Sequence, residues 1–159
     1  MKMIIKKSTV FVFAVAGICC TLSAQSLKWA DGKEFVRKLS NTLYEPVPAG
    51  IVSYKIENNQ CRMLFNGVPT SDKPKIYCSH VDGKYAYYNG DDNILGSYIP
   101  SQGRYYVISS KGNEILKEES LAVLINGALY LNTGEEPVVK YMLDEGFDPI
   151  VVGFFLFDF

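Results

Sequence analysis

Residues 75–109 have the sequence KIYCSHVDGKYAYYNGDDNILGSYIPSQGRYYVIS, and this stretch decides the fold class. Short runs rich in Tyr, Ile and Val alternate in it with the turn pairs Asp82-Gly83 and Asn89-Gly90. Such runs are typical of β-strands, and such pairs are typical of tight turns. Strands this closely spaced pair with their chain neighbours, so the stretch predicts an antiparallel, meander-like sheet.

The same pattern continues on both sides of this stretch. The expected strands cover residues 51–57, 61–65, 75–80, 84–88, 94–99 and 104–109. The clearest hairpin joins 121–125 to 128–131 through Asn126-Gly127, because these residue types suit a two-residue type I′ turn. The acids just before Leu121 leave a helix as the alternative there.

Two segments have helical patterns instead. Asp31 with Glu34 forms a capping box, and an apolar stripe follows it at Phe35, Val36, Leu39 and Leu43. The second segment, 136–145, has Pro137 in its first turn, followed by an apolar stripe at Val138, Val139, Met142 and Leu143. The sequence therefore predicts one helix near each end of the domain.

The last residues are continuously apolar. Residues 150–157 carry large apolar side chains on both faces of any strand that they form. Such a run predicts a strand buried on both faces, covered by the preceding helix. Together these patterns predict a single α+β domain, an antiparallel meander-like β-sheet with one helix near each end of the mature chain.

The chain begins with a signal-peptide pattern. Basic residues precede an apolar run over 9–20, which is shorter than the ~20 residues of a membrane-spanning helix, and small residues follow it. Cleavage after Ala24 gives a signal peptide of 1–24 and a domain of 25–159, while cleavage after Ser26 is the alternative. The leader resembles those of exported Gram-negative bacterial proteins, which implies a periplasmic, cell-surface or extracellular location. A lipid anchor on Cys19 or Cys20 lacks the small residue that should precede it.

Charge excludes one class of partner. The chain has 16 basic and 17 acidic side chains, and removing 1–24 removes three lysines and no acid. The mature net charge is therefore 13 − 17 = −4. Nucleic-acid binding requires clustered Lys and Arg, so no nucleic-acid partner is expected, and nothing in the mature chain predicts a transmembrane helix.

Cys61 and Cys78 are the cysteines of the mature chain, and export permits them to form a disulfide. If the strands around them pair with Phe65 opposite Lys75, Cys61 faces Ser79 and lies within one register step of Cys78. A bridge closing a loop of this size would stabilise the fold by roughly 3 kcal/mol. Two separate buried thiols are the alternative.

Metal and cofactor chemistry is not expected. His80 is the sole histidine, so Cys and His together cannot supply the four ligands that zinc prefers. The oxygen-rich residues 89–93 lack the bidentate Glu of a hand-type calcium loop, and a solvated turn explains them. No Gly-x-Ser-x-Gly motif is present for a serine nucleophile.

Tyrosine supplies the one positive signal for binding. A cluster in the central strands, which could bind a glycan, a peptide or a partner protein, consists of Tyr85, Tyr87, Tyr88, Tyr98, Tyr105 and Tyr106. Strand alternation places Tyr85 and Tyr87 on one face and Tyr88 on the other. Simple packing of half-buried sheet residues is the alternative.

Three function classes follow from these observations. The first is a small exported, non-catalytic binding or interaction module. The second is a small secreted hydrolase that uses paired carboxylates, for which the candidates are Glu118-Glu119, Glu135-Glu136 and Asp144-Glu145. The third is a small outer-membrane β-barrel, suggested by aromatic residues alternating to Phe159, although the apolar end lacks the polar alternation of a membrane strand.

Overall fold

The computed structural model describes residues 25–112 and 114–158, so the expected signal peptide lies outside the described residues. These residues contain thirteen strands, a 3₁₀ helix η1 (Pro100–Gln102) and an α-helix α1 (Pro149–Leu156). The strands are β1 (Ser26–Trp29), β2 (Glu34–Lys38), β3 (Leu43–Pro46), β4 (Val52–Glu57), β5 (Gln60–Phe65), β6 (Val68–Pro69), β7 (Ile76–Val81), β8 (Lys84–Asn89), β9 (Ile94–Ile99), β10 (Arg104–Lys111), β11 (Glu114–Ile125), β12 (Ala128–Leu131) and β13 (Val138–Leu143).

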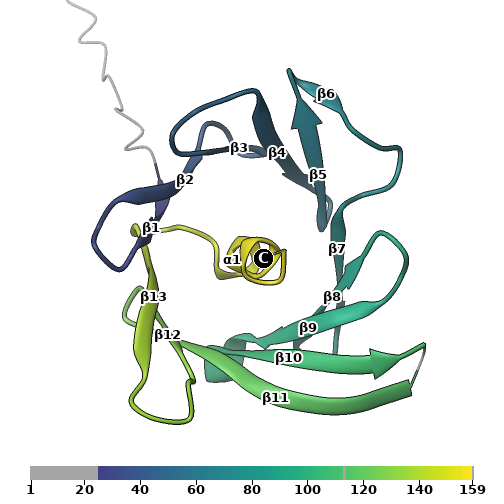
Figure 1. Cartoon of the computed structure of the whole chain (residues 1–159), viewed down its shortest axis with the longest axis vertical. Coiled ribbons are helices and arrows are strands. Elements are labelled where there is room, and N and C mark those ends of the chain that lie inside the picture. Colours follow the sequence, from purple (N-terminus) through teal and green to yellow (C-terminus); the bar gives the residue numbers. More distant parts are fainter. Residues whose placement is uncertain (1–24, 113, 159) are drawn as a thin grey trace, which may run out of the picture.

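The strands close into a barrel (Figure 1). All the pairings are antiparallel, and each ring strand pairs with its neighbours in chain order. The first strand meets the last, with Leu27 opposite Leu143. Within the described sheet β6 pairs with β5 alone, so the other twelve strands form the closed ring. The expected meander is present, but the expected α+β architecture is wrong, because the sheet closes on itself.

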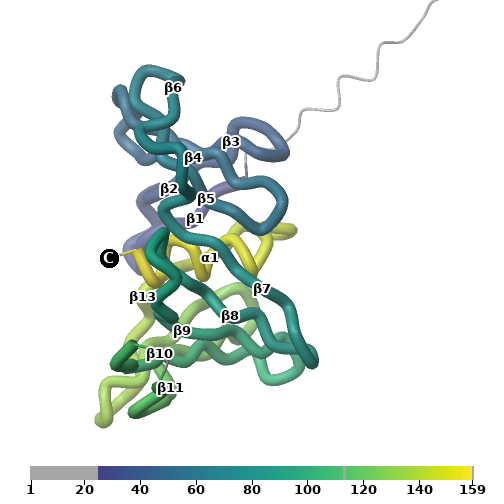
Figure 2. Tube along the Cα trace, turned by 90° about the vertical axis from the view of Figure 1, so that its right-hand side faces the viewer, coloured from purple at the N-terminus to yellow at the C-terminus, as the bar shows by residue number. Residues whose placement is uncertain are grey.

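The α-helix α1 lies inside the barrel (Figures 1 and 2). Its cap is Asp148, whose side chain accepts a hydrogen bond of 2.8 Å from the Ile150 backbone N–H, and Pro149 occupies the first turn. The expected strand over 150–157 is therefore wrong. Its expected burial is present, since residues 151–156 are all buried. A segment that is apolar all round can satisfy its backbone as a helix when a barrel wall surrounds it.

The helix expected after Asp31 is also wrong, because strands β2 and β3 cover that segment. Asp31 accepts a hydrogen bond from the Lys33 backbone N–H within a turn, and Glu34 pairs with Arg37 instead of capping a helix. Val36 is buried in the lumen, whereas Arg37 lies on the outer wall. Burial in this segment thus follows the two-residue alternation of a strand, not the three-to-four-residue spacing of a helix.

Strand β13 replaces the helix expected over 136–145. Tyr141 and Leu143 belong to the lumenal core, while Met142 between them is exposed. The neighbouring hairpin at Asn126-Gly127 is confirmed, with φ of 49° and 77° at the two turn residues. The helical alternative for that hairpin is therefore wrong.

Aromatic side chains fill the space between wall and helix. Tyr87 and Tyr105 donate hydrogen bonds to the Ile150 and Pro149 carbonyls of α1, at 2.8 and 2.7 Å. Gly153 faces the Tyr87 ring so closely that a Cβ atom there would overlap it. The helix is therefore in direct contact with the β8 and β10 strands of the barrel wall.

Replacing Gly153 with alanine tests this contact. Because the new methyl group would overlap the Tyr87 ring in a packed lumen, Gly153→Ala should destabilise the protein by about 1–3 kcal/mol. Gly50→Ala is the matched control, since a Cβ atom there meets nothing within 4 Å. Urea unfolding curves measure both variants, and equal midpoints for the two would contradict the contact.

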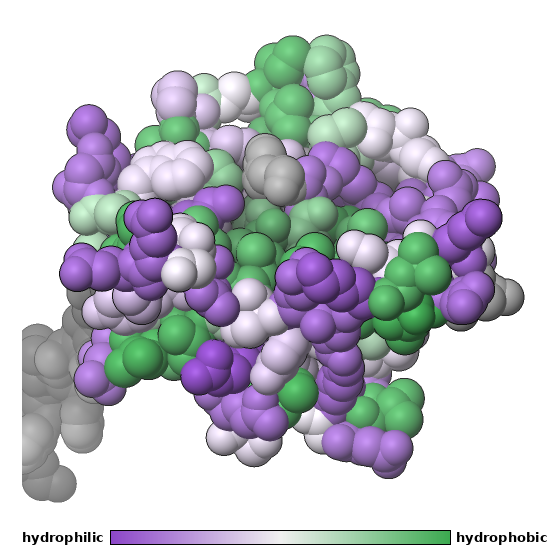
Figure 3. All heavy atoms as spheres, turned by 60° about the horizontal axis from the view of Figure 1, so that its bottom comes forward, coloured by the Kyte–Doolittle hydropathy of each residue, from purple (hydrophilic) through white to green (hydrophobic). Residues whose placement is uncertain are grey.

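The outer wall carries ion pairs. Lys28 lies 2.6 Å from Asp144, which also accepts a hydrogen bond from the buried Ser26 hydroxyl, and Lys84 lies 2.6 Å from Glu118. Figure 3 shows charged and polar side chains over much of one face, with separate apolar patches between them. No helix within residues 25–112 and 114–158 is long and apolar enough to cross a bilayer.

Candidate functional site

The six candidate tyrosines do not form one surface. Tyr87, Tyr98 and Tyr105 are buried in the lumen, and Tyr85 packs against them from the same side. Tyr98 and Tyr105 stack with ring centroids 4.4 Å apart. For these four residues the structure shows packing, the alternative that the sequence left open.

Tyr88 and Tyr106 are outside the lumenal core, on the outer wall. Tyr88 stacks on Tyr77 with ring centroids 5.1 Å apart, and the Tyr77 hydroxyl donates a hydrogen bond of 2.8 Å to Asp92. The Tyr106 hydroxyl donates to Gln102 at 2.9 Å. Tyr77 was not among the sequence candidates, although the alternation of β7 would have placed it on the outer face.

The structure has two free thiols in place of the expected bridge. Cys61 lies opposite Ile76, not opposite Ser79, so Cys78 is its diagonal neighbour. Diagonal Cβ atoms lie ~7–8 Å apart, whereas a disulfide needs ~4 Å. Burial raises the pKa of Cys61 to about 12 and that of Cys78 to about 11. Both thiols are therefore protonated and shielded at neutral pH.

A thiol assay follows from this geometry. The folded protein should react slowly with a thiolate-selective reagent, because both thiols are buried and protonated. The unfolded, unreduced protein should show two reactive thiols per chain. If no thiol reacts after unfolding, the disulfide is present and β5 pairs with β7 in a different register.

The other sequence candidates have structural partners. His80 stacks on Tyr85 at 4.3 Å, and the Asn89 side chain accepts hydrogen bonds from the backbone N–H groups of Asp91 and Asn93. Glu118 pairs with Lys84. Among the described residues no group of three or more His, Cys, Asp or Glu side chains could hold a metal ion.

A hollow of about 380 Å³ opens at the end of the lumen where α1 terminates. We call it the mouth hollow, and it is lined by Leu95, Val107, Ile108, Leu121, Leu131, Lys140, Leu156 and Phe157. Five consecutive strands, β9 to β13, contribute its wall residues. Gly96 permits this arrangement, because a Cβ atom there would overlap the Phe157 ring.

Among the described residues that line the mouth hollow, Lys140 alone is charged. Its ammonium group lies 5.2 Å from the centroid of the Tyr141 ring, close enough for a cation–π contact. No carboxylate of residues 25–112 and 114–158 forms an ion pair with it. The hollow thus combines apolar walls with one cation that forms no ion pair with a carboxylate of the described residues.

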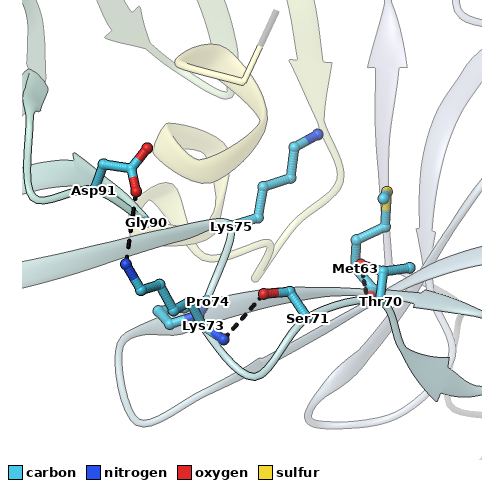
Figure 4. A pocket seen from close by; sticks show the side chains of 8 residues that line it. All are labelled: Met63, Thr70, Ser71, Lys73, Pro74, Lys75, Gly90 and Asp91. Carbon is cyan, nitrogen blue, oxygen red and sulfur yellow. Dashed lines mark hydrogen bonds and ion pairs between the residues drawn. The ribbon is translucent and has the colours of Figure 1, made fainter.

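A second hollow differs in charge (Figure 4). It has about 260 Å³, and its lining includes Met63 of β5 and the loop residues Lys73, Lys75 and Asp91. Lys73 pairs with Asp91 at 3.6 Å, and Lys75 pairs with Asp158 at 2.6 Å. Both lysines are neutralised within the protein, so this hollow offers no free charge to a ligand.

The hollow beside the entry of α1 is acidic. It has about 390 Å³, and its lining includes Asp144 and Glu145. Partial burial acts to raise the pKa of Asp144, but hydrogen bonds from Lys28 and Ser26 outweigh that effect and hold the pKa below its usual value. The Asp144 carboxylate is therefore ionised at neutral pH, where it bonds to Lys28 and Ser26 of strand β1.

Comparisons with known proteins give no indication of what this site binds. No family model matches this chain, and no curated protein or solved structure matches it. Sequence patterns missed the mouth hollow because its lining side chains come from separate strands and share no motif. Leu95, Val107 and Leu121 would each have been assigned simply to the core.

Proposed function

We propose that this protein is a non-catalytic binding module that takes a small, largely apolar molecule into the mouth hollow. The observation that carries the proposal is an apolar hollow of about 380 Å³ with one convergent charged group. Ligand sites in proteins have volumes of about 300–1,000 Å³ and occur in the mouths of β-barrels. The export signal predicted from the leader would place such a module in the periplasm or outside the cell.

The surroundings of the hollow suit binding better than catalysis. Lys140 is the one titratable side chain among its described lining residues, and hydrolysis by carboxylates needs a facing pair. The candidate acids Glu118 and Asp144 each bond to a lysine on the outer wall. The packed lumen beneath the hollow also fixes Leu156 and Phe157 in advance, which lowers the entropic cost of binding.

Methyl NMR with decanol as the probe tests the proposal. Leu95, Leu121, Leu131 and Leu156 should shift on titration, whereas the exposed Leu39 and Ile51 should not. Val107→Trp should weaken binding by filling the hollow, and Val81→Trp is the control, because Val81 is exposed and does not line it. Shifts spread evenly over all methyl groups, or none at all, would refute the site.

An outer-membrane barrel is the second candidate function. The closed antiparallel ring with an even number of strands favours it, since such barrels span outer membranes. Ten of the twelve ring strands, however, have four to six residues, whereas a membrane strand needs about 9–11. The ion pairs of the outer wall would also be costly in lipid.

Fractionation of the native cell separates the two candidates. The binding module should be released with the aqueous fraction once the envelope is opened. Recovery solely with detergent-solubilised outer membrane, after washing at high salt, would support the membrane barrel instead.

A further inference from the structure

We infer that the mouth hollow selects amphipathic anions, with an aliphatic tail against its apolar wall and a carboxylate paired with Lys140. This inference rests on the proposed function and adds the chemical class of the ligand. It is carried by the position of Lys140 at the hollow and by the fact that no carboxylate of residues 25–112 and 114–158 forms an ion pair with it.

The local environment makes an anion the matching partner for this lysine. The Lys140 ammonium lies over the Tyr141 ring, beside a wall made of leucine, valine, isoleucine and phenylalanine side chains. An ammonium group beside apolar surface loses part of its hydration. A carboxylate that arrives with its own apolar tail restores the lost polar contacts as a charge-assisted hydrogen bond.

The acids that line two of the other hollows, within the part of the chain that the structure describes, are paired with other lysines. Another hollow, of about 520 Å³, shares Val107 and Leu121 with the mouth hollow, and its acidic lining residue is Glu119. Glu119 forms an ion pair of 2.7 Å with Lys117. Asp91, the acid of the hollow in Figure 4, is likewise paired with Lys73.

The shared boundary also provides room for a head group. Beyond Val107 and Leu121 the lining becomes polar, with Ser120, Asn132 and Thr133. A hydroxyl or an amide can donate to the carboxylate oxygen that Lys140 does not reach. The apolar hollow that contains Lys140 and the polar side chains of the second hollow therefore adjoin at Val107 and Leu121.

Three probes of equal chain length test the inference: decanoate, decanol and decylammonium, each kept below its micelle concentration. Decanoate should bind about tenfold more tightly than decanol, because its carboxylate forms a charge-assisted hydrogen bond with Lys140 that the decanol hydroxyl cannot match. Decylammonium should bind more weakly than decanol. Calorimetry measures the affinities, and the Lys140 side-chain NMR signals should shift with decanoate in the unmodified protein.

Two variants isolate the role of the lysine. Lys140→Met should reduce decanoate affinity to that of decanol, while Lys73→Met, a control with its ammonium in a different hollow, should leave the ratio unchanged. Equal affinities for decanoate and decanol in the unmodified protein would overturn the inference and leave the proposed function standing. Failure of all three probes to bind would overturn both.

Discussion

Removal of residues 149–159 is expected to abolish cooperative folding. The segment contains α1, whose buried side chains contact all sides of the lumen, among them Val151, Val152, Phe154, Phe155 and Leu156. Burying each such side chain stabilises a protein by roughly 1.5–3 kcal/mol, against a total stability of about 5–15 kcal/mol. Without α1 the lumen would lose these buried apolar side chains, and the short strands of the wall could not replace them.

Circular dichroism during thermal unfolding measures this effect. The truncated chain should show no cooperative transition, and a synthetic peptide of residues 147–159 added in trans should restore one, because it supplies the missing lumenal contacts. A truncated chain that melts cooperatively by itself would show that α1 does not hold the barrel together.

Alkaline unfolding is the second large effect. Burial raises the pKa of Tyr44 and of Tyr141 to about 12, and it raises the pKa of Tyr87 and Tyr105 well above the usual value of 10.0. The unfolded chain therefore releases these protons at lower pH than the folded chain does. The stability that these tyrosines contribute is complete below about pH 10 and is lost as the pH rises toward about 12.

The size of the alkaline effect follows from the number of lumenal tyrosines. One pKa unit corresponds to about 1.4 kcal/mol, so several such groups together match the typical stability of a domain. Tyrosinate absorbance and far-ultraviolet circular dichroism should change together in one cooperative transition. Independent titration of the tyrosines with the secondary structure intact would contradict the lumenal packing.

A pair of variants distinguishes lumenal from outer tyrosines. Tyr141→Phe removes one hydroxyl from the lumen and should move the alkaline midpoint upward, provided that the ring packing against Phe35 is kept. Tyr106→Phe removes a hydroxyl from the outer wall and should leave the midpoint where it is.

The strands were predictable because their signals are local. Asp82-Gly83, Asn89-Gly90 and Asn126-Gly127 all form turns between paired strands, and each turn depends on a few adjacent residues. The closure of the barrel was not predictable in this way. It depends on Leu27 meeting Leu143 across the whole chain, and no short-range pattern encodes that pairing.

The last helix shows the limit of periodicity. Residues 150–157 are β-branched or aromatic at most positions, a composition that favours strands. Asp148-Pro149 was a helix-start signal, but the continuous apolar run that follows has neither a two-residue nor a helical period. The enclosing wall decides the outcome, because inside the barrel no strand edge remains for the segment to pair with.

None of the binding residues proposed from the sequence is among the described residues that line the mouth hollow. Tyrosine content pointed to the central strands, yet Tyr87 and Tyr105 support the helix instead of facing a ligand. No sequence pattern marked Lys140 as a binding residue, because a single lysine in a strand is common. Its significance arises from Leu95, Leu121 and Leu156, which the closed sheet brings to the same hollow.

The most direct test of the account is a measurement of nuclear Overhauser contacts in the labelled protein. A closed barrel around α1 should give contacts between the Tyr87 ring protons and the Gly153 α-protons, which place α1 inside the lumen, together with contacts between Leu27 and Leu143, which close the barrel. If Gly153 instead gives the cross-strand contacts of an extended segment and Leu27 has none with Leu143, the closed barrel around a helix is refuted, and the mouth hollow with it.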